Sequence, residues 1–286
     1  MRICYNTVMS ESMRKLIALD LDGTLLTTDK KISDRTRRAL AGAIEAGMEL
    51  VVVTGRPLSG LPEELDEIPQ IRYAITSNGA VTTDIRAGKV LRSCLIRPSI
   101  ANRIVPIPEE ARWIYSVFID GIGYCAPFAY DHLRTFFTGT VLDTYVQRSR
   151  RKAEDMEGLI SSSAGVENIW IVCDDPEQAA GLGGWICERL DLQIFRTAPN
   201  DIEVGAPGAD KGAALEDLYR SLKIRRERVF AVGDNHNDLS MLQSAGTAIA
   251  MGNAAEEIRN IAHKITDSND NDGVAKILES LIQRSL

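Results

Sequence analysis

Short apolar runs that end at polar residues recur along the chain. Five of them have the length of a strand: residues 15–19, 50–53, 71–75, 229–232 and 247–250. Such runs are typical of strands buried on both faces, as in a parallel sheet. Between the first two, Ser33 suits a helix N-cap and Gly47 the residue after a helix. Leu40, Ala43 and Ile44 supply an apolar stripe, so the pattern predicts a βαβ unit.

The ends of these predicted strands carry the polar residues. The residues that follow the runs are Asp20, Thr54, Ser77-Asn78-Gly79, Gly233-Asp234 and Gly252-Asn253. Ligands of open α/β sheets bind outside the carboxyl ends of the strands, so we expect these positions to meet in one crevice. Asn253 and Glu256 have the spacing of a capping box, which predicts a helix start there.

The segment 85–197 has a different pattern. Its strand-like runs are Val90–Ile96, Tyr115–Ile119, Val141–Val146, Asn168–Cys173 and Gln193–Thr197, separated by helical or turn-rich stretches. Pro106 and Pro108 stand where a helix would be expected and predict an interruption. We expect an α/β protein with a Rossmann-like, doubly wound parallel sheet as its core (13–84 and 198–286). Residues 85–197 form an inserted α+β cap in this interpretation, and 1–12 an N-terminal extension.

Composition excludes several classes of protein. The 286 residues are 44% hydrophobic and 26% charged, an ordinary globular balance, and the net charge is −7. With no block rich in Lys or Arg, nucleic acid and anionic membranes are not expected as partners. The five cysteines are scattered without a C-x-x-C pair, and no signal peptide or membrane-spanning run occurs. We expect a soluble protein of the reducing cytoplasm.

The strongest chemical signal is LIALDLDGTLL at residues 16–26. It places Asp20 and Asp22 directly after a buried strand, and carboxylates are costly to bury without a role. A carboxylate can act as the nucleophile in phosphoryl transfer, and a second one can protonate the leaving oxygen and then deprotonate water. We assign these roles to Asp20 and Asp22, against the alternative of a strand end with an Asx-turn.

A second signal, VFAVGDNHNDLSML at 229–242, brings Asp234, Asn237 and Asp238 after another buried strand. By itself such a loop could be a solvated turn. Together with Asp20, however, Asp234 gives an oxygen-only ligand set that suits Mg²⁺. A hard cation has no need of imidazole, so His236, like His132 and His263, is interpreted as non-catalytic.

Two weaker motifs would handle phosphate. VVVTGRP at 51–57 places Thr54 and Gly55 where a hydroxyl and a backbone N–H can bind phosphate oxygens. The second motif is Asp210-Lys211-Gly212, which opens the helical pattern Ala213–Leu222. Its Lys211 could supply positive charge for an anionic substrate. Other phosphate-handling signatures are absent: no Cys precedes an Arg by six residues, and neither a P-loop nor G-x-S-x-G occurs. GIGYCA at 121–126 matches a dinucleotide fingerprint, but its flanks predict a hairpin.

These motifs, in this order, resemble the haloacid dehalogenase (HAD) superfamily, in particular its Cof-type phosphatases with a type 2 (IIB) cap. The resemblance spans residues 13–286. It rests on DLDGTL (20–25), VVVTGRP (51–57), TSNGA (76–80), ADKGAAL (209–215), VGDNHNDLSML (232–242), AMGNA (250–254) and TDSNDNDGVAKIL (266–278). Asp22 distinguishes the chain from true haloacid dehalogenases, which lack that acid and need no metal.

The resemblance also implies roles. Asp20 attacks phosphorus and Asp22 serves as general acid and base. Asp20 and Asp234 bind Mg²⁺ through carboxylates, and Asp22 through its main-chain carbonyl. The implied phosphate-binding positions are the Leu21 backbone, Thr54, Gly55, Lys211 and Asn237. Asp238 orients the metal site without binding the ion.

The sequence thus predicts a Mg²⁺-dependent phosphatase that hydrolyses small phosphomonoesters, such as sugar phosphates, through a phospho-aspartyl intermediate on Asp20. The expected partner is a small phosphorylated metabolite, whose identity depends on the cap. Two alternatives stay open. One is a phosphomutase or a dedicated sugar-phosphate phosphatase of the same cap group, and the other is a non-catalytic regulatory module on the same fold.

Overall fold

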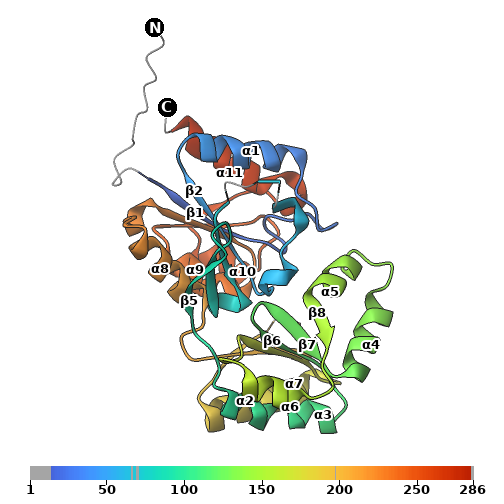
Figure 1. Ribbon diagram of the computed structural model, residues 1–286. Coiled ribbons are helices and arrows are strands. Elements are labelled where there is room, and N and C mark those ends of the chain that lie inside the picture. Colours follow the sequence, from blue (N-terminus) through green and yellow to red (C-terminus); the bar gives the residue numbers. More distant parts are fainter. Residues whose placement is uncertain (1–13, 66, 69–70, 197, 285–286) are drawn as a thin grey trace.

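The computed structural model describes residues 14–65, 67–68, 71–196 and 198–284. Two β-sheets organise these residues, and Figure 1 shows them one below the other, each with its own helices. The upper unit, the core, contains both the early and the late parts of the chain. The lower unit, the cap, comes from the middle. The expected extension, residues 1–12, lies outside the described residues.

The core sheet has the strand order β14-β13-β12-β1-β2-β3-β4-β5. Its strands are β1 (Leu16–Asp20), β2 (Glu49–Val53), β3 (Tyr73–Thr76), β4 (Val81–Asp84), β5 (Lys89–Ser93), β12 (Val229–Gly233), β13 (Thr247–Ala250) and β14 (Lys264–Ile265). The six strands from β14 to β3 are parallel, whereas β4 and β5 add antiparallel pairs. All five strands predicted for the core are present, and the α/β fold class is confirmed.

Helices cover both faces of the core sheet. They are α1 (Asp34–Glu45), α8 (Lys211–Ser221), α9 (Leu239–Ser244), α10 (Glu256–Ile261) and α11 (Gly273–Gln283). α1 and α11 pack together on one side, and α8 and α9 on the other (Figure 1). As predicted, the Ser33 hydroxyl accepts the Thr36 N–H at the start of α1, and Gly47 follows its end with φ +77°.

The cap sheet has the order β10-β11-β9-β6-β7-β8 and is mostly antiparallel. Its strands are β6 (Ile114–Ile119), β7 (Ile122–Cys125), β8 (Arg150–Lys152), β9 (Asn168–Val172), β10 (Gln193–Phe195) and β11 (Asp201–Gly205). The cap helices are α2 (Pro98–Ile104), α3 (Pro106–Glu110), α4 (Pro127–Phe137), α5 (Asp143–Ser149), α6 (Met156–Ser162) and α7 (Pro176–Leu190). The hairpin predicted at 121–126 is β6–β7. Pro106 separates α2 from α3 as expected, whereas Pro108 lies within α3 and does not interrupt it.

The predicted boundaries of the cap each misplace one strand. β5, expected in the cap, pairs with β4 in the core sheet, and β11, expected in the core, pairs with β9 and β10 in the cap sheet. Strand partners decide the membership of both. A boundary drawn from the spacing of apolar runs cannot contain that information, because hydrogen-bonding partners lie far apart in sequence.

Two local predictions are wrong. Val141–Val146 was expected as a strand, but residues 143–149 form α5. The Asp143 carboxylate accepts the Gly139 N–H and a hydrogen bond from Arg134, which fixes the turn that starts this helix. Asn253 does not cap α10, whose N-cap is Ala255. Instead, its side chain donates to the Gly23 carbonyl and so joins two loops of the core.

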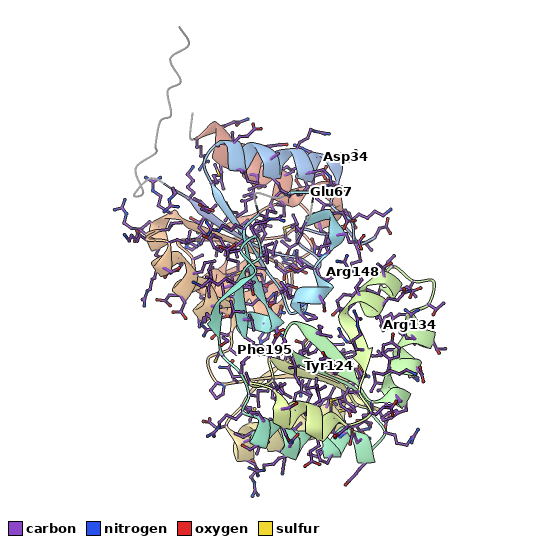
Figure 2. All side chains as sticks on the ribbon, in the orientation of Figure 1. Asp34, Glu67, Tyr124, Arg134, Arg148 and Phe195 are labelled. Atoms are coloured by element: carbon purple, nitrogen blue, oxygen red, sulfur yellow. The ribbon has the colours of Figure 1, made fainter. Side chains whose placement is uncertain are left out.

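Several contacts join cap and core. The buried Glu167 carboxylate, just before β9, accepts hydrogen bonds from the Ser77 hydroxyl and from the Gly121 N–H, both 2.7 Å long. Arg148, which Figure 2 labels on α5, lies 2.9 Å from Glu63 of the core. The two units therefore face each other across the carboxyl ends of the core strands. None of the helices in the described ranges combines the length and apolar character needed to cross a membrane.

Candidate active site

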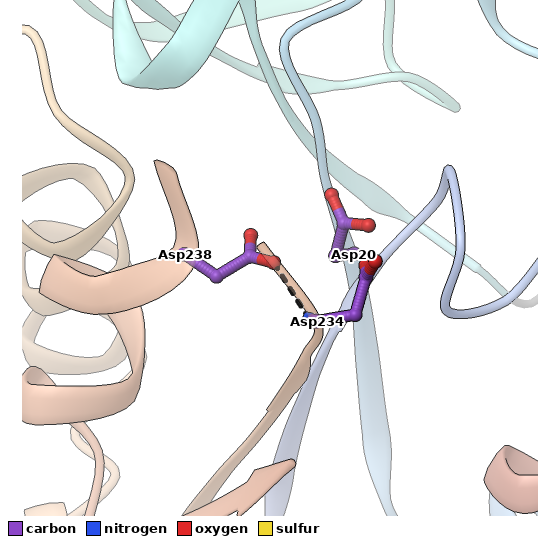
Figure 3. Close-up of side chains that lie close together, drawn as sticks. All are labelled: Asp20, Asp234 and Asp238. Carbon is purple, nitrogen blue, oxygen red and sulfur yellow. Dashed lines mark hydrogen bonds between the residues drawn. The ribbon is translucent and has the colours of Figure 1, made fainter. Parts of the chain in front are cut away.

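A cluster of three carboxylates and one lysine lies at the carboxyl ends of β1 and β12, with Asp20, Asp238 and Lys211 buried and Asp234 partly exposed. Asp20 is the last residue of β1, and Asp234 and Asp238 follow β12 (Figure 3). The Lys211 ammonium, at the start of α8, lies 2.8 Å from Asp20 Oδ1 and 2.7 Å from Asp238 Oδ1. Lys211 is 1% exposed, so these contacts form away from bulk water, where ionic attraction is strong.

Burial and mutual repulsion shape the charges of this cluster. Burial, followed by the Asp238 charge, raises the pKa of Asp20 well above its usual value, and Lys211 offsets part of that rise. Burial also raises the pKa of Asp234 to about 6, with a further contribution from Asp238. Burial lowers the pKa of Lys211, but the two carboxylates beside it outweigh this effect and raise it overall. The cluster favours added positive charge.

The carboxylates fit a divalent cation. Ligand atoms of Asp20, Asp234 and Asp238 all lie within 4.8 Å of one another. However, Asp238 already accepts the Lys211 ammonium on Oδ1 and the backbone N–H groups of Asp234 and Asn235 on Oδ2. Asp20 and Asp234 are therefore the better direct ligands, and Asp238 holds the loop in place. The all-oxygen donor set suits Mg²⁺.

Asp22 lies beside this cluster, but its carboxylate contacts two positively charged side chains. Arg56 forms a two-pronged contact with its carboxylate, at 2.6 Å on each oxygen, and the Lys30 ammonium lies 2.8 Å from Oδ1. Burial opposes ionisation of Asp22, but these partners outweigh it and lower its pKa to about 2. The carboxyl group is thus ionised here. Donating a proton requires it to separate from Arg56.

The remaining predicted residues reach the same place from other strands. Asp20, Asp22, Thr54, Gly55 and Asn237 all line one cavity of about 490 Å³ between core and cap. Lys211 and Asp238 form the buried cluster with Asp20, and Leu21, fully buried between the two aspartates, can offer only its backbone. The crevice expected from the polar strand ends is therefore present after β1, β2 and β12, whereas Asn78 and Asn253 are not among the residues that line it. The roles of the site residues remain predictions.

The cap supplies the opposite wall of this cavity. Alternate residues of β6, β9 and β11 point toward it, while the residues between them pack into the apolar interior of the cap. The residues on this wall are Phe118, Leu133, Phe137, Leu142, Tyr145, Val146, Arg150, Trp170, Asp201 and Glu203. Glu203 accepts hydrogen bonds from Asn168 and from Asn78 of the core. Burial raises its pKa to about 7, although the Asn168 hydrogen bond opposes the rise.

The sequence interpretation missed some residues of this cavity. Arg56 belongs to the quoted TGRP motif, yet only Thr54 and Gly55 received roles. Its position directly after them was the available signal. Nothing local to the chain singles out Arg150 or Glu203, because pairing of the cap strands brings them to the cavity. The histidines lie elsewhere: His236 contacts Glu257 and His263 accepts the Ala248 N–H.

A Rossmann-like core, an inserted cap and acidic residues at the strand ends together are the arrangement of capped hydrolases. A profile of the haloacid dehalogenase-like hydrolase family matches residues 17–278. The chain belongs to this family. The predicted superfamily is therefore confirmed, and so is the prediction of a phosphatase-type hydrolase.

Similar proteins support this assignment over nearly the whole chain. A 5-amino-6-(5-phospho-D-ribitylamino)uracil phosphatase of Bacillus subtilis is 30% identical, covering 92% of this chain and 94% of its own. A pyridoxal phosphate phosphatase of Escherichia coli is 28% identical, covering 93% and 98%. Among solved structures, a haloacid dehalogenase-like hydrolase from B. subtilis superposes with a TM-score of 0.79 at 32% identity, covering 93% and 99%.

The fold of the cap has relatives as well. A sugar phosphatase described as HAD subclass IIB superposes with a TM-score of 0.79 at 22% identity, covering 93% of this chain and 98% of its own. At that identity the likeness concerns the fold alone. It agrees with the type 2 cap predicted from the sequence.

Proposed function

We propose that this protein is a Mg²⁺-dependent phosphatase that hydrolyses small phosphomonoesters through a phospho-aspartyl intermediate on Asp20. The observation that carries the proposal is the position of Asp20. It lies at the floor of the cavity, beside Asp234 and against Lys211. Phosphoryl transfer depends chiefly on positioning and on neutralising charge, and this arrangement provides both.

Each residue of the site has a part in this proposal. Asp20 attacks phosphorus, and Lys211 orients it and balances charge on the phosphoryl oxygens. Thr54, Gly55 and the Leu21 N–H hold those oxygens, together with Asn237. Asp20, Asp234 and the Asp22 carbonyl would hold Mg²⁺, which would neutralise charge between the carboxylate and the phosphate.

Asp22 is proposed as the acid that protonates the leaving oxygen and then as the base that deprotonates water. Its contacts with Arg56 and Lys30 mean that it acts only after its carboxyl group leaves them. Arg56 also lies 4.7 Å from the ring centre of Tyr145 in the cap. We propose that cap movement and release of Asp22 are coupled through this contact.

The substrate is proposed to be a small phosphorylated metabolite. The relatives carry names of phosphatases for pyridoxal phosphate and for an aminouracil ribityl phosphate, both small phosphomonoesters. A cavity of about 490 Å³ has the size of a small-molecule site. The cytoplasmic location remains a prediction from cysteine usage.

Assay of p-nitrophenyl phosphate hydrolysis tests the proposal. We expect turnover that needs Mg²⁺, stops on chelation with EDTA and returns when Mg²⁺ is added. Asp20→Asn should abolish it, whereas the matched change Asp29→Asn, in the nearby loop outside the cluster, should not. Undiminished turnover after thorough chelation would remove the metal from the proposal. Absence of turnover in every condition would favour the non-catalytic regulatory module.

The phosphomutase alternative needs a separate experiment. A mutase returns the phosphoryl group to bound product, whereas a phosphatase passes it to water. Labelled bisphosphate distinguishes the two, because transfer of label into a second sugar phosphate marks a mutase and release as inorganic phosphate marks the proposed enzyme.

A further inference from the structure

Arg150, the first residue of β8, is a buried cation on the cap wall of the cavity. It is 5% exposed, and it lines the same cavity as Asp20 and Asp22. Burying a guanidinium is costly unless a carboxylate or several hydrogen bonds compensate for lost water. The partners of Arg150 therefore indicate what this position is built for.

Those partners are hydroxyl groups and aromatic rings. Its Nε donates to the Ser116 hydroxyl at 2.9 Å, and one terminal nitrogen, Nη1, donates to the Ser149 hydroxyl at 2.8 Å. The guanidinium carbon lies 4.6 Å from the ring centre of Phe118, 5.3 Å from that of Tyr145 and 5.9 Å from that of Trp170. These contacts hold the plane of the guanidinium in one orientation.

The charge of Arg150 has no carboxylate partner anywhere in the part of the chain that the structure describes. Its second terminal nitrogen, Nη2, also has no hydrogen-bond acceptor among the described residues. This atom is not fully enclosed by protein. Since Arg150 lines the cavity, a molecule inside the cavity meets a guanidinium that has no carboxylate partner. A fixed cation with free N–H groups matches an anionic oxygen group.

The acidic residues of the cap wall lie at its other end. Asp201 and Glu203 are on β11, which pairs with β9 on the side away from β6, β7 and β8. Trp170 of β9 lies between them and Arg150, since its ring contacts Arg150 and its indole N–H donates to Asp201 at 3.2 Å. A ligand at Arg150 thus approaches a positive end of the wall.

We propose that Arg150 determines specificity by binding an anionic group, a carboxylate or a second phosphate, on the part of the substrate that leaves with the ester oxygen. This inference rests on the proposed function. The reacting phosphate is bound at the core by Lys211 and its neighbours. Arg150 faces it across the cavity and selects phosphomonoesters whose leaving group carries a negative charge of its own.

Two matched pairs of substrates test this inference. The carboxylate pair is 6-phosphogluconate and sorbitol 6-phosphate, which differ in a carboxylate and a CH₂OH group. The phosphate pair is fructose 1,6-bisphosphate and fructose 6-phosphate. In at least one pair, we expect the wild-type protein to show a kcat/KM about 10- to 100-fold higher for the member with the additional carboxylate or phosphate. This is the gain expected from a charge-assisted hydrogen bond. The pair that shows it identifies the anion.

The variants are Arg150→Met and Arg150→Lys, with Arg151→Met as the control. Arg151 is the next residue of β8, is exposed, and donates to backbone carbonyls outside the cavity. Arg150→Met should reduce the preference within a pair to about one, and Arg150→Lys should reduce it partly because the fork is lost. Arg151→Met should leave the preference unchanged. If the Arg150→Met variant unfolds at the assay temperature, the Arg150→Lys variant tests the inference instead.

Equal kcat/KM within both pairs for the wild-type protein would overturn the inference. So would an Arg150→Met variant that slows all substrates alike and keeps their preference, since Arg150 would then only stabilise the cap. If p-nitrophenyl phosphate and all four metabolites are inert, the proposed function fails instead. Calorimetric titration with the carboxylate pair then decides: tighter binding of 6-phosphogluconate that Arg150→Met removes supports the inference, and equal binding refutes it.

Discussion

Replacing Lys211 with methionine should destabilise the folded protein far more than removing an exposed lysine. Lys211 is the first residue of α8, where the helix dipole disfavours a positive charge. Its ammonium nevertheless lies 2.8 Å from Asp20 Oδ1 and 2.7 Å from Asp238 Oδ1, with all three side chains nearly excluded from water. Lys211 therefore balances carboxylates that have little other access to positive charge.

The expected loss follows from that burial. Removing one partner of a buried ion pair leaves a charge without solvent or counter-ion and costs about 3–5 kcal/mol. Lys276→Met is the matched control, because the Lys276 ammonium lies 2.5 Å from Asp267 but their side chains are 38% and 56% exposed. Exposed pairs contribute roughly 0–1 kcal/mol. The two variants should thus differ by several kcal/mol, although each loses one lysine.

Thermal unfolding followed by circular dichroism, at pH 7 and without divalent cations, measures this difference. Lys211→Met should lower Tm by on the order of 10 °C, and Lys276→Met by about 2 °C or less. Added Mg²⁺ should recover part of the loss in Lys211→Met if the ion binds the same carboxylates, since a ligand of the folded state stabilises it. Equal Tm values for the two variants would show that Lys211 does not balance the cluster, and the reasoning above would be wrong.

Three further predictions concern single residues. Asp22→Asn should lower kcat by about 10²–10⁴-fold while Mg²⁺ still protects against unfolding, and a fully active variant would require another acid. The raised pKa of Glu203 means that its protonated form stabilises the fold; this contribution is complete below pH 4.5 and is lost as the pH rises through about 7. Relative to Glu203→Gln, the wild-type protein should therefore lose about 3 kcal/mol over that range, and parallel stability profiles in urea titrations would contradict this. Gly212→Ala should destabilise measurably, because an added Cβ would lie 2.3 Å from the Ser240 carbonyl oxygen, whereas Gly184→Ala, with open space, should not.

The sequence was informative about the core for a physical reason. A parallel strand covered on both faces is an apolar run whose end leads directly to the ligand-binding edge, so strand position and site position are encoded in the same few residues. Asp20, Thr54 and Asp234 could be placed at one edge on this ground alone. The start of α1 was likewise predictable, because Ser33 caps the helix through a bond three residues away.

Tertiary structure decided what depends on partners distant in sequence. β5 and β11 belong to other sheets than predicted, because strand pairing, not strand propensity, decides which sheet a strand joins. Residues 141–146 suggested a strand in the sequence, but residues 143–149 form α5, and its Val146 packs with Ala129 and Leu133 of α4.

The same distinction applies to the site. The sequence identified Asp22 as a carboxylate next to the nucleophile, but only the fold shows that Arg56 holds it ionised. Arg150 has no motif around it, and it reaches the cavity through the pairing of β8 with β7 and the packing of three rings. Chemistry that acts on phosphate needs particular residue types at strand ends, and these can be recognised from the sequence alone. Recognition of the rest of the substrate depends on a cap wall assembled from strands that are distant in sequence. The role of a charged residue on that wall can be inferred only when its burial and its neighbours are known.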